Sequence, residues 1–378
     1  MGRQSVFQLL LVCLYAGIDD GRGVELPISR LRHLSRPASR RRPGGTPRRS
    51  RAPAATRSAV ATLAAGDATV LEDVADHPRF EFVRGDITDR ELVRKLFEEH
   101  DFLGVMHLAA ESHVDRSIVD PMAFVQTNVN GTVVLLQEAA TAWGNDPTRR
   151  FHHISTDEVF GALGPDGAFV EESPYQPNSP YSASKAASDH FVRAWGETYG
   201  LSYVITNCTN NYGPYQFPEK LIPVVIDRAL RREPVPVYGE GSNIRDWLYV
   251  EDHCRALRLV FDEGTVDSTY CIGGEEELSN LELVELILDT LDELQGNDPQ
   301  SSRSLISFVT DRPGHDFRYA MDISHIKDSL GWKPSIDITS GIRATVSWYL
   351  ENQIWAERVT GDDHDSFQSE WYKERGDE

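Results

Sequence analysis

The chain has 378 residues and a formal net charge of −21, and that charge is divided unevenly. Residues 1–65 carry a balance of +9, whereas residues 66–378 carry −30. The acidic excess argues against binding of nucleic acid by the main body, whose length suits one large α/β domain or a domain with a smaller partner. No segment is apolar over a transmembrane length and no cysteines form a close pair, so we expect a cytoplasmic protein without membrane, disulfide or zinc chemistry.

The acidic body is also poor in lysine, since the whole chain has six. Many carboxylates with few lysines are typical of a surface adapted to concentrated salt, where screening suppresses self-repulsion. An ordinary acidic cytosolic protein is the alternative interpretation.

Strands and helices alternate from about residue 80 in the hydrophobic pattern. We predict, in chain order, a strand at 80–83, a helix beginning at the N-cap Asp89, a strand at 103–110, a helix at 121–143, a strand at 151–155, a helix at 179–199 and a strand at 201–207. This alternation predicts a doubly wound, Rossmann-like α/β fold with a parallel sheet covered on both faces.

The later chain is more irregular and predicts a smaller second lobe. We expect a helix at 221–232, an extended segment at 234–238, a helix opened by a capping box of Ser279 and Glu282, and a last helix at 342–350.

Tyr181 and Lys185 lie four residues apart at the start of a predicted helix. That spacing places both side chains on one face, where the ammonium can lower the pKa of the phenol. A phenolate so placed is a general base for a substrate hydroxyl during hydride removal. The pair alone is also common on protein surfaces, but Ser155 and Thr156 at the end of the preceding strand supply a third hydroxyl-bearing partner.

Asp157 and Glu158 follow the strand at 151–155, at an edge where α/β sheets place their ligands. Two adjacent carboxylates repel one another, which can keep one protonated and the other ionised. An acid beside a base can eliminate water from a sugar, whereas the simpler interpretation is an acidic turn. Lys220, Arg245, Arg312 and His315 in the later chain are cationic or ionisable groups suited to a diphosphate.

These motifs together resemble the extended short-chain dehydrogenase/reductases and, within them, the dTDP-glucose 4,6-dehydratases. The similar strings are residues 107–117, 151–161, 179–185, 207–221, 244–253 and 311–315, and the resemblance extends from Leu71 to Tyr372. The adjacent acids of the Thr-Asp-Glu string are the most specific element, because sugar-nucleotide 4-epimerases of the same fold lack them.

The resemblance implies conversion of dTDP-glucose to dTDP-4-keto-6-deoxyglucose on bound NAD by a homodimeric enzyme. Tyr181, with Lys185 and Thr156, would remove the C4 hydroxyl proton. Glu158 would then take the C5 proton while Asp157 protonates the departing C6 hydroxyl. A related 4-epimerase, a dehydratase of another nucleotide sugar and a non-catalytic truncated remnant remain the alternatives.

The resemblance also implies binding residues, position by position. Those expected to contact NAD are Asp86, Ile87, Leu108, Ala109, Ala110, Thr127, Tyr181, Lys185 and Asn211. Those expected to contact the nucleotide sugar are Ser112, Thr156, Asn210, Lys220, Leu221, Pro236, Val237, Tyr238, Arg245, Asn280, Asp311 and His315. We expect an NAD-binding domain at 66–210 with return segments near 245–275, and a mainly substrate-binding lobe at 211–378.

Residues 1–65 depart from this family, which begins with a strand, a glycine-rich loop and a second strand. We expect both strands to be missing from the segment, and no GxGxxG motif occurs in residues 1–80. We interpret 1–65 as an aberrant, disordered basic segment produced by a shifted reading frame in a G+C-rich gene. A genuine basic tail that binds nucleic acid or acidic surfaces is the competing hypothesis.

Overall fold

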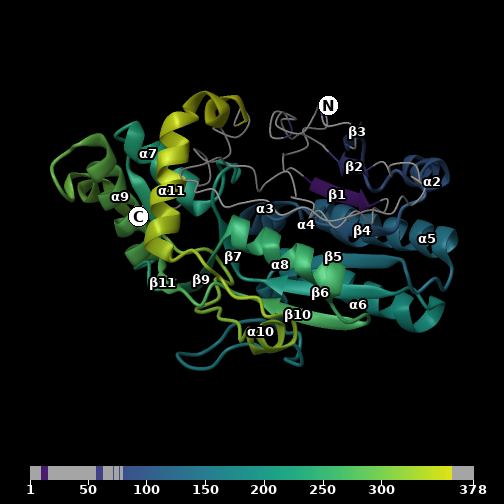
Figure 1. The fold of residues 1–378 in the computed structure, drawn as a ribbon. Helices are drawn as coiled ribbons and strands as arrows, with labels where there is room; N and C mark the ends of the chain where they lie inside the picture. The colour runs from purple at the N-terminus through teal and green to yellow at the C-terminus, as the bar shows by residue number, and fades with distance from the viewer. Residues whose placement is uncertain (1–9, 16–56, 63–70, 72–75, 77–79, 360–378) are drawn as a thin grey trace, which may run out of the picture.

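The computed structural model describes residues 10–15, 57–62, 71, 76 and 80–359. Figure 1 shows a central sheet flanked by helices, with a smaller lobe built around α7, α9 and α11 on one side. Within the described ranges, no helix has both the length and the apolar character needed to cross a membrane.

The central sheet has seven strands in the order β10-β6-β5-β4-β1-β2-β3. In chain order they are β1 (Leu10–Tyr15), β2 (Arg57–Thr62), β3 (Phe80–Arg84), β4 (Gly104–His107), β5 (Arg150–Thr156), β6 (Tyr203–Cys208) and β10 (Ser268–Ile272). Neighbouring strands pair in parallel except at β1, which is antiparallel to both β2 and β4. The predicted doubly wound fold is confirmed.

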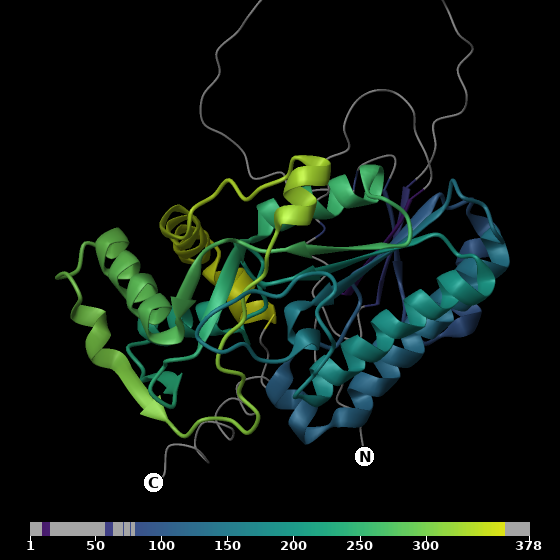
Figure 2. The same ribbon diagram turned by 90° about the horizontal axis from the view of Figure 1, so that it is seen from below.

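Helices cover both faces of this sheet, as Figure 2 shows from below. The helices packed around the sheet are α2 (Arg90–Glu99), α3 (Val114–Val119), α4 (Pro121–Phe124), α5 (Thr132–Trp143), α6 (Pro180–Tyr199), α8 (Val250–Glu263) and α10 (Ser324–Leu330). Successive strand residues point to opposite faces, so Val105 packs in the core under α2, α5 and α6, and Met106 packs in the core under α8 and α10.

Local sequence signals account for several helix ends. Asp89 caps α2 by accepting a hydrogen bond of 3.1 Å from the backbone N–H of Leu92. Gly200 ends α6 with a φ of 68°, a left-handed conformation that glycine adopts without steric cost. The predicted long helix at 121–143 is continuous from α4 to α5 through a π-helical stretch, η3 (Val125–Gly131).

The structure differs from the expectation that both first strands are missing, because β1 and β2 lie between β4 and β3 in the sheet. The apolar sequence of Leu10–Tyr15 is long enough for one strand, and residues 57–62 are rich in small and β-branched residue types. The rest of the segment predicted to be disordered, residues 1–9, 16–56 and 63–65, lies outside the described residues, as does Tyr372.

The smaller lobe has a three-stranded sheet, a two-stranded sheet and the helices α7, α9 and α11 around one apolar core, against which the helical residues 353–359 also pack. Its elements are β7 (Asn210–Tyr212), α7 (Leu221–Leu230), β8 (Val235–Tyr238), β9 (Ile244–Tyr249), β11 (Glu277–Ser279), α9 (Asn280–Gln295), η5 (Ser301–Leu305), β12 (Ile306–Val309) and α11 (Ile338–Glu351). Ser279 and Glu282 form the predicted capping box of α9. The last helix begins at Ile338, earlier than expected, after the N-cap Asp337.

Candidate active site

Tyr181 and Lys185 occupy the first turns of α6. Ser179 caps this helix in a capping box with Ser182, and Pro180 at the first helical position preorganises its start. Both functional side chains are buried, and Lys185 Nζ donates a 2.8 Å hydrogen bond to the carbonyl of Ile154 on β5. The start of α6 is therefore hydrogen-bonded directly to the carboxyl end of β5.

The Thr-Asp-Glu string forms the transition from β5 into a short 3-10 helix, η4 (Asp157–Phe160). Thr156 Oγ1 donates to Asp157 Oδ1 at 3.0 Å and accepts from the backbone N–H of Glu158 at 3.3 Å. Thr156 also hydrogen-bonds with the Tyr181 hydroxyl. The structure thus brings all five predicted catalytic residues together at the carboxyl end of β5.

The two adjacent acids have different environments. Burial, reinforced by the neighbouring Glu158 carboxylate, raises the pKa of Asp157 well above its ordinary value. Burial also raises the pKa of Glu158, but Arg312, Arg245 and Lys220 oppose that effect. Asp157 is therefore the member of the pair that holds a proton more readily, and Glu158 the one that ionises more readily. Asp157 Oδ2 has no hydrogen-bond partner among the described residues, which leaves it available to a ligand.

The expected lowering of the Tyr181 pKa is not observed. Burial and the Glu158 carboxylate raise the pKa of Tyr181 well above its ordinary value, although its hydrogen bond with Thr156 acts in the opposite direction. Burial likewise lowers the pKa of Lys185 to about 8. Desolvation of the closely packed helix start, which sequence spacing does not reveal, accounts for both effects.

The residues predicted to hold NAD lie mainly in loops after successive strands. Asp86 and Ile87 follow β3, Leu108 to Ala110 follow β4, and Thr127 lies in the π-helical stretch. Asp86 Oδ1 accepts two 2.8 Å hydrogen bonds, from the N–H and the hydroxyl of Thr88, and so stabilises its own turn. Ala109 and Ala110 are buried and small, as close approach of a cofactor to the backbone requires.

The hydrogen bonds of Asn211 indicate whether the catalytic edge of the sheet can hold an NAD molecule. Its Nδ2 donates to the carbonyl of Thr209 at 3.1 Å, whereas its buried Oδ1 has no partner among the described residues. An orphaned carbonyl oxygen beside the catalytic edge is an acceptor for an amide or hydroxyl donor of a ligand. The residues at this end fit NAD. The glycine-rich pyrophosphate loop, in contrast, is absent from residues 1–80.

Several predicted substrate residues make contacts in or with the smaller lobe. Lys220 Nζ donates to the carbonyl of Ser112 at 2.7 Å, and the rings of Tyr238 and His315 lie 6.0 Å apart. His315 Nδ1 is 2.6 Å from Asp311 Oδ1. Arg245 is buried with its guanidinium 4.3 Å from the ring centroid of Tyr319. Of these side chains, Lys220 and Arg245 also act electrostatically on Glu158.

Other predicted substrate residues are not joined to this cluster by a contact of their side chains. Val237 is buried in the core of the smaller lobe, and Leu221 packs against the same core. Pro236 adjoins Val237 on β8, Asn210 begins β7, and Asn280 is the first residue of α9. Their places in the fold are compatible with binding through backbone groups or with side chains that a ligand orders.

Sequence analysis missed residues that organise the site. Asp115, on α3, accepts from Tyr238 at 3.0 Å and from Arg312 Nη1 at 3.2 Å, and so links the lobes. Asn128 donates to the carbonyl of Glu111 at 3.0 Å and to Ser184 at 2.8 Å. Asp115 lies inside a string that the family resemblance had marked, but nothing local to either residue reveals its distant partners.

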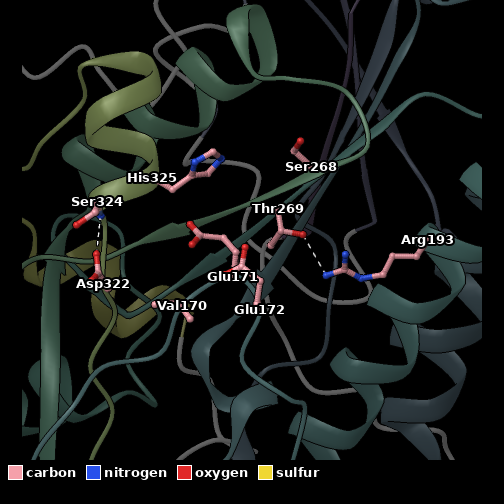
Figure 3. Close-up of a pocket in the computed structure, with 9 residues that line it drawn as sticks. All are labelled: Val170, Glu171, Glu172, Arg193, Ser268, Thr269, Asp322, Ser324 and His325. Carbon is pink, nitrogen blue, oxygen red and sulfur yellow. Dashed lines mark hydrogen bonds between the residues drawn. The ribbon is translucent and has the colours of Figure 1, made fainter.

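A separate cavity of about 590 Å³ opens beside the edge strand β10 (Figure 3). The described residues that line it come from the segment before α6, from α6, from β10 and from the start of α10, and none of them is a predicted site residue. This cavity is therefore distinct from the cluster around Tyr181 and Glu158.

Comparison with known proteins agrees with this geometry. The model of the GDP-mannose 4,6 dehydratase family matches residues 56–345. A dTDP-glucose 4,6-dehydratase of Xanthomonas campestris pv. campestris (strain B100) is 55% identical over 295 residues, which cover 76% of this chain and 83% of the relative. The dTDP-glucose 4,6-dehydratase 1 of Escherichia coli (strain K12) is 50% identical over 325 residues, covering 82% and 90%.

Solved structures show the same relationship. DesIV, a dTDP-glucose 4,6-dehydratase from Streptomyces venezuelae solved with NAD and TYD bound, superposes with a TM-score of 0.72 at 45% identity, covering 78% of this chain and 87% of DesIV. A UDP-glucose 4-epimerase from Thermotoga maritima superposes with a TM-score of 0.68 at 26% identity, covering 78% and 90%. The chain therefore belongs to the GDP-mannose 4,6 dehydratase family and, within it, groups with the dTDP-glucose 4,6-dehydratases.

Proposed function

We propose that this enzyme dehydrates dTDP-glucose to dTDP-4-keto-6-deoxyglucose with NAD as its cofactor. The observation that carries the proposal is the adjacent pair Asp157 and Glu158, the first with a strongly raised pKa and the second near cations, beside Tyr181 and Lys185. Relatives named for this reaction share half or more of the aligned residues.

Each catalytic side chain has a defined proton to move. Tyr181 would accept the C4 hydroxyl proton as C4 is oxidised to a ketone. Thr156 favours its phenolate against the burial that raises the Tyr181 pKa, and Lys185 would supply a positive charge on the same helix face. NAD held by the residues after the strands would supply the redox chemistry, as acceptor of the C4 hydride and as its donor to C6. The ketone acidifies the C5 proton, so that Glu158 can remove it while Asp157 protonates the C6 hydroxyl, which leaves as water. A proton returned to C5 by Glu158 completes the product, and transfer of the proton held by Tyr181 to Asp157 by way of solvent restores both side chains.

The environment of the acids supports this division of roles. Asp157, whose pKa burial raises, holds a proton that it can donate to a leaving hydroxyl. Glu158 is half-buried and faces Arg312, Arg245 and Lys220, which favour its ionised form. The same three cations are suited to the diphosphate of a nucleotide sugar.

The NAD-binding role falls to residues after the strands. Asp86 and Ile87 after β3, the small residues after β4 and Thr127 would hold the adenosine side, and Asn211 with Tyr181 and Lys185 the nicotinamide side. Gly131 makes room for this arrangement, since a Cβ there would lie 2.4 Å from Cδ1 of Ile87. Denaturing the purified chain and measuring released NAD tests this role, because a truncated remnant would release none.

The reaction is tested by separating oxidation from elimination. The double variant Asp157→Asn, Glu158→Gln should form NADH from dTDP-glucose in a single turnover but release no 4-keto-6-deoxy product. Reduced cofactor is followed by absorbance and water loss by mass spectrometry. Loss of water at the wild-type rate in the double variant contradicts the assigned roles, and formation of dTDP-galactose by the wild type would indicate a 4-epimerase.

We also propose that two copies form a dimer through helices on one face of the sheet. Ile118, Val119, Met122 and Val125 are exposed, and their spacing places them on one side of the α3–η3 segment. Replacing Val119 and Met122 by Glu should shift the mass measured by light scattering from dimer to monomer, whereas a wild-type monomer would contradict the proposal.

The proposed location is the cytoplasm. The described cysteines Cys208, Cys254 and Cys271 are buried and free, as is usual in a reducing compartment. Fractionation of the producing cells tests this location, since activity confined to another fraction would contradict it.

A further inference from the structure

Three ionisable side chains lie on one face of α6 at intervals of four residues: Tyr181, Lys185 and Asp189. The first two have roles in the proposed reaction. Asp189 lies one helical turn beyond Lys185 and is completely shielded from solvent. A buried aspartate without a structural or catalytic reason would carry a large desolvation penalty, so its partners reveal its role.

Asp189 receives hydrogen bonds from three separate segments. Its Oδ2 accepts from Ser155 Oγ on β5 and from the Tyr175 hydroxyl, both at 2.8 Å, and from Asn207 Nδ2 on β6 at 3.5 Å. His153 Nε2 lies 3.1 Å from Asp189 Oδ1. Burial disfavours its charge, yet these donors and nearby Lys185 hold the pKa of Asp189 below its ordinary value. The carboxylate is therefore ionised inside the protein.

Lys185 depends on that carboxylate for its charge. Burial lowers the pKa of Lys185 to about 8, and the groups that act in the opposite direction are Asp189 and Cys208. His107 and His153 also face the ammonium, and burial keeps both imidazoles neutral near pH 7 by lowering their pKa values. Burial likewise raises the pKa of Cys208, to about 12, so its thiol is neutral. Asp189 is thus the one formal negative charge in this described set.

We propose that Asp189 is a positioning residue that keeps Lys185 protonated and fixes the carboxyl end of β5 beneath Tyr181. The geometry joins the two tasks, because Lys185 donates to the carbonyl of Ile154 while Asp189 accepts from Ser155, the next residue of the same strand. The consequence for catalysis rests on the proposed function, whereas the electrostatic coupling of Asp189 to Lys185 does not.

The contact chain extends from Asp189 to the surface. Arg193 Nη2 donates to the Tyr175 hydroxyl at 3.4 Å, so that this hydroxyl is oriented to donate its own proton to Asp189. Arg193 also donates to Thr269 Oγ1 at 3.0 Å across the cavity beside β10, as the dashed line in Figure 3 shows. The cavity wall thereby supports Tyr175, which in turn holds the buried carboxylate.

The scarcity of lysine makes a direct test possible, since the full chain has six. We would label the lysine side chains with ¹³C at Cε, assign the Lys185 resonance from the Lys185→Arg spectrum, and titrate it by NMR. Asp189→Asn should lower the Lys185 midpoint from about 8 by at least about one pH unit, because an opposite charge beside the ammonium is lost. The pH at which the rate of NADH formation declines on the alkaline side should fall together with the Lys185 midpoint.

Asp292→Asn is the matched control. Asp292 is equally buried, accepts several hydrogen bonds, among them 2.8 Å from the Ser302 N–H, and lies in the smaller lobe. This variant should leave the Lys185 midpoint unchanged. An unchanged midpoint in Asp189→Asn overturns the proposal.

The proposal for Asp189 can also be tested if the Asp189→Asn variant does not fold or if the chain is inactive. If circular dichroism shows that Asp189→Asn does not fold, the titration midpoint of Lys185 in the unsubstituted protein tests the proposal instead. A midpoint near 8 supports the proposal. A midpoint below about 6 overturns it, because that is the range of buried lysines without an anionic partner. Because the titration needs no substrate, a chain inactive on dTDP-glucose would contradict the proposed function and leave the test of Asp189 intact.

Discussion

Glu111 should make the stability of this protein fall as the pH rises. It follows the small residues after β4 and is half-buried. Burial and the nearby carboxylate of Glu219 raise the pKa of Glu111 to about 7, although Arg116 and Lys220 act against them. The folded protein therefore binds a proton here more tightly than the unfolded chain, whose glutamates titrate near 4.5.

Proton linkage gives the sign and the size of this change in the free energy of unfolding. A raised folded pKa means that the free energy of unfolding is highest below the unfolded value and declines as the pH rises toward about 7. A difference of about 2.5 pH units corresponds to about 3 kcal/mol for a fully shielded group. Because Glu111 is only half-buried, water screens part of this penalty, and we expect about 1–2 kcal/mol. Glu111→Gln should therefore be more stable than the unsubstituted protein at about pH 8 by this amount.

Equilibrium urea unfolding of both proteins at about pH 4.5 and about pH 8 measures this difference, with the change in midpoint converted through a common slope. Glu99→Gln, at an exposed position on α2, is the control and should show the same difference at both pH values. If Glu111→Gln gained no stability on going to the higher pH, the reasoning about its buried environment would be refuted.

Three other predictions concern packing, substrate binding and salt. Gly341→Ala should destabilise the fold by about 1–3 kcal/mol in urea unfolding, because its Cβ would lie 2.0 Å from the Tyr212 hydroxyl oxygen; an unchanged midpoint would contradict this. Lys220→Met should raise KM for dTDP-glucose about tenfold or more in steady-state assays with a smaller change in kcat, and an effect on kcat alone would contradict a role in binding. Raising NaCl from about 0.1 M to about 1 M should increase the unfolding free energy, because salt screens the acidic body; a decrease would contradict that interpretation.

Much of the sheet could be predicted from the sequence because its inner strands are short segments rich in apolar and β-branched residues. Residues 151–155 and 201–207 mix such residues with polar ones, and both are strands within a residue or two of the prediction. The strand β9 was not predicted because its sequence includes Arg245 and Asp246, both of which are buried. Arg245 packs over Tyr319 and Asp246 accepts from backbone N–H groups, partners that a local pattern cannot reveal.

In the candidate site, too, residues defined by local sequence could be predicted and residues defined by distant partners could not. Tyr181 with Lys185 and Asp157 with Glu158 are recognisable because residue type and spacing within one element carry their chemistry. Asp115 is not, since its partners Tyr238 and Arg312 are 123 and 197 residues away. The effect of burial on the pKa of Tyr181 was missed for a related reason, because desolvation depends on the packing of several elements.

The direction of β1 bears on how the cofactor is held. In its antiparallel register with β4, Val12 pairs with His107 and Tyr15 with Gly104, so β1 ends at the edge where β4 begins. The catalytic residues lie at the opposite edge, after the carboxyl ends of β4 and β5. In a Rossmann fold the phosphate-binding loop follows a parallel first strand and emerges at the catalytic edge. β1 therefore ends at the edge opposite the catalytic residues, and the described groups that we propose to hold NAD are the loops after β3 and β4, α6 and Asn211.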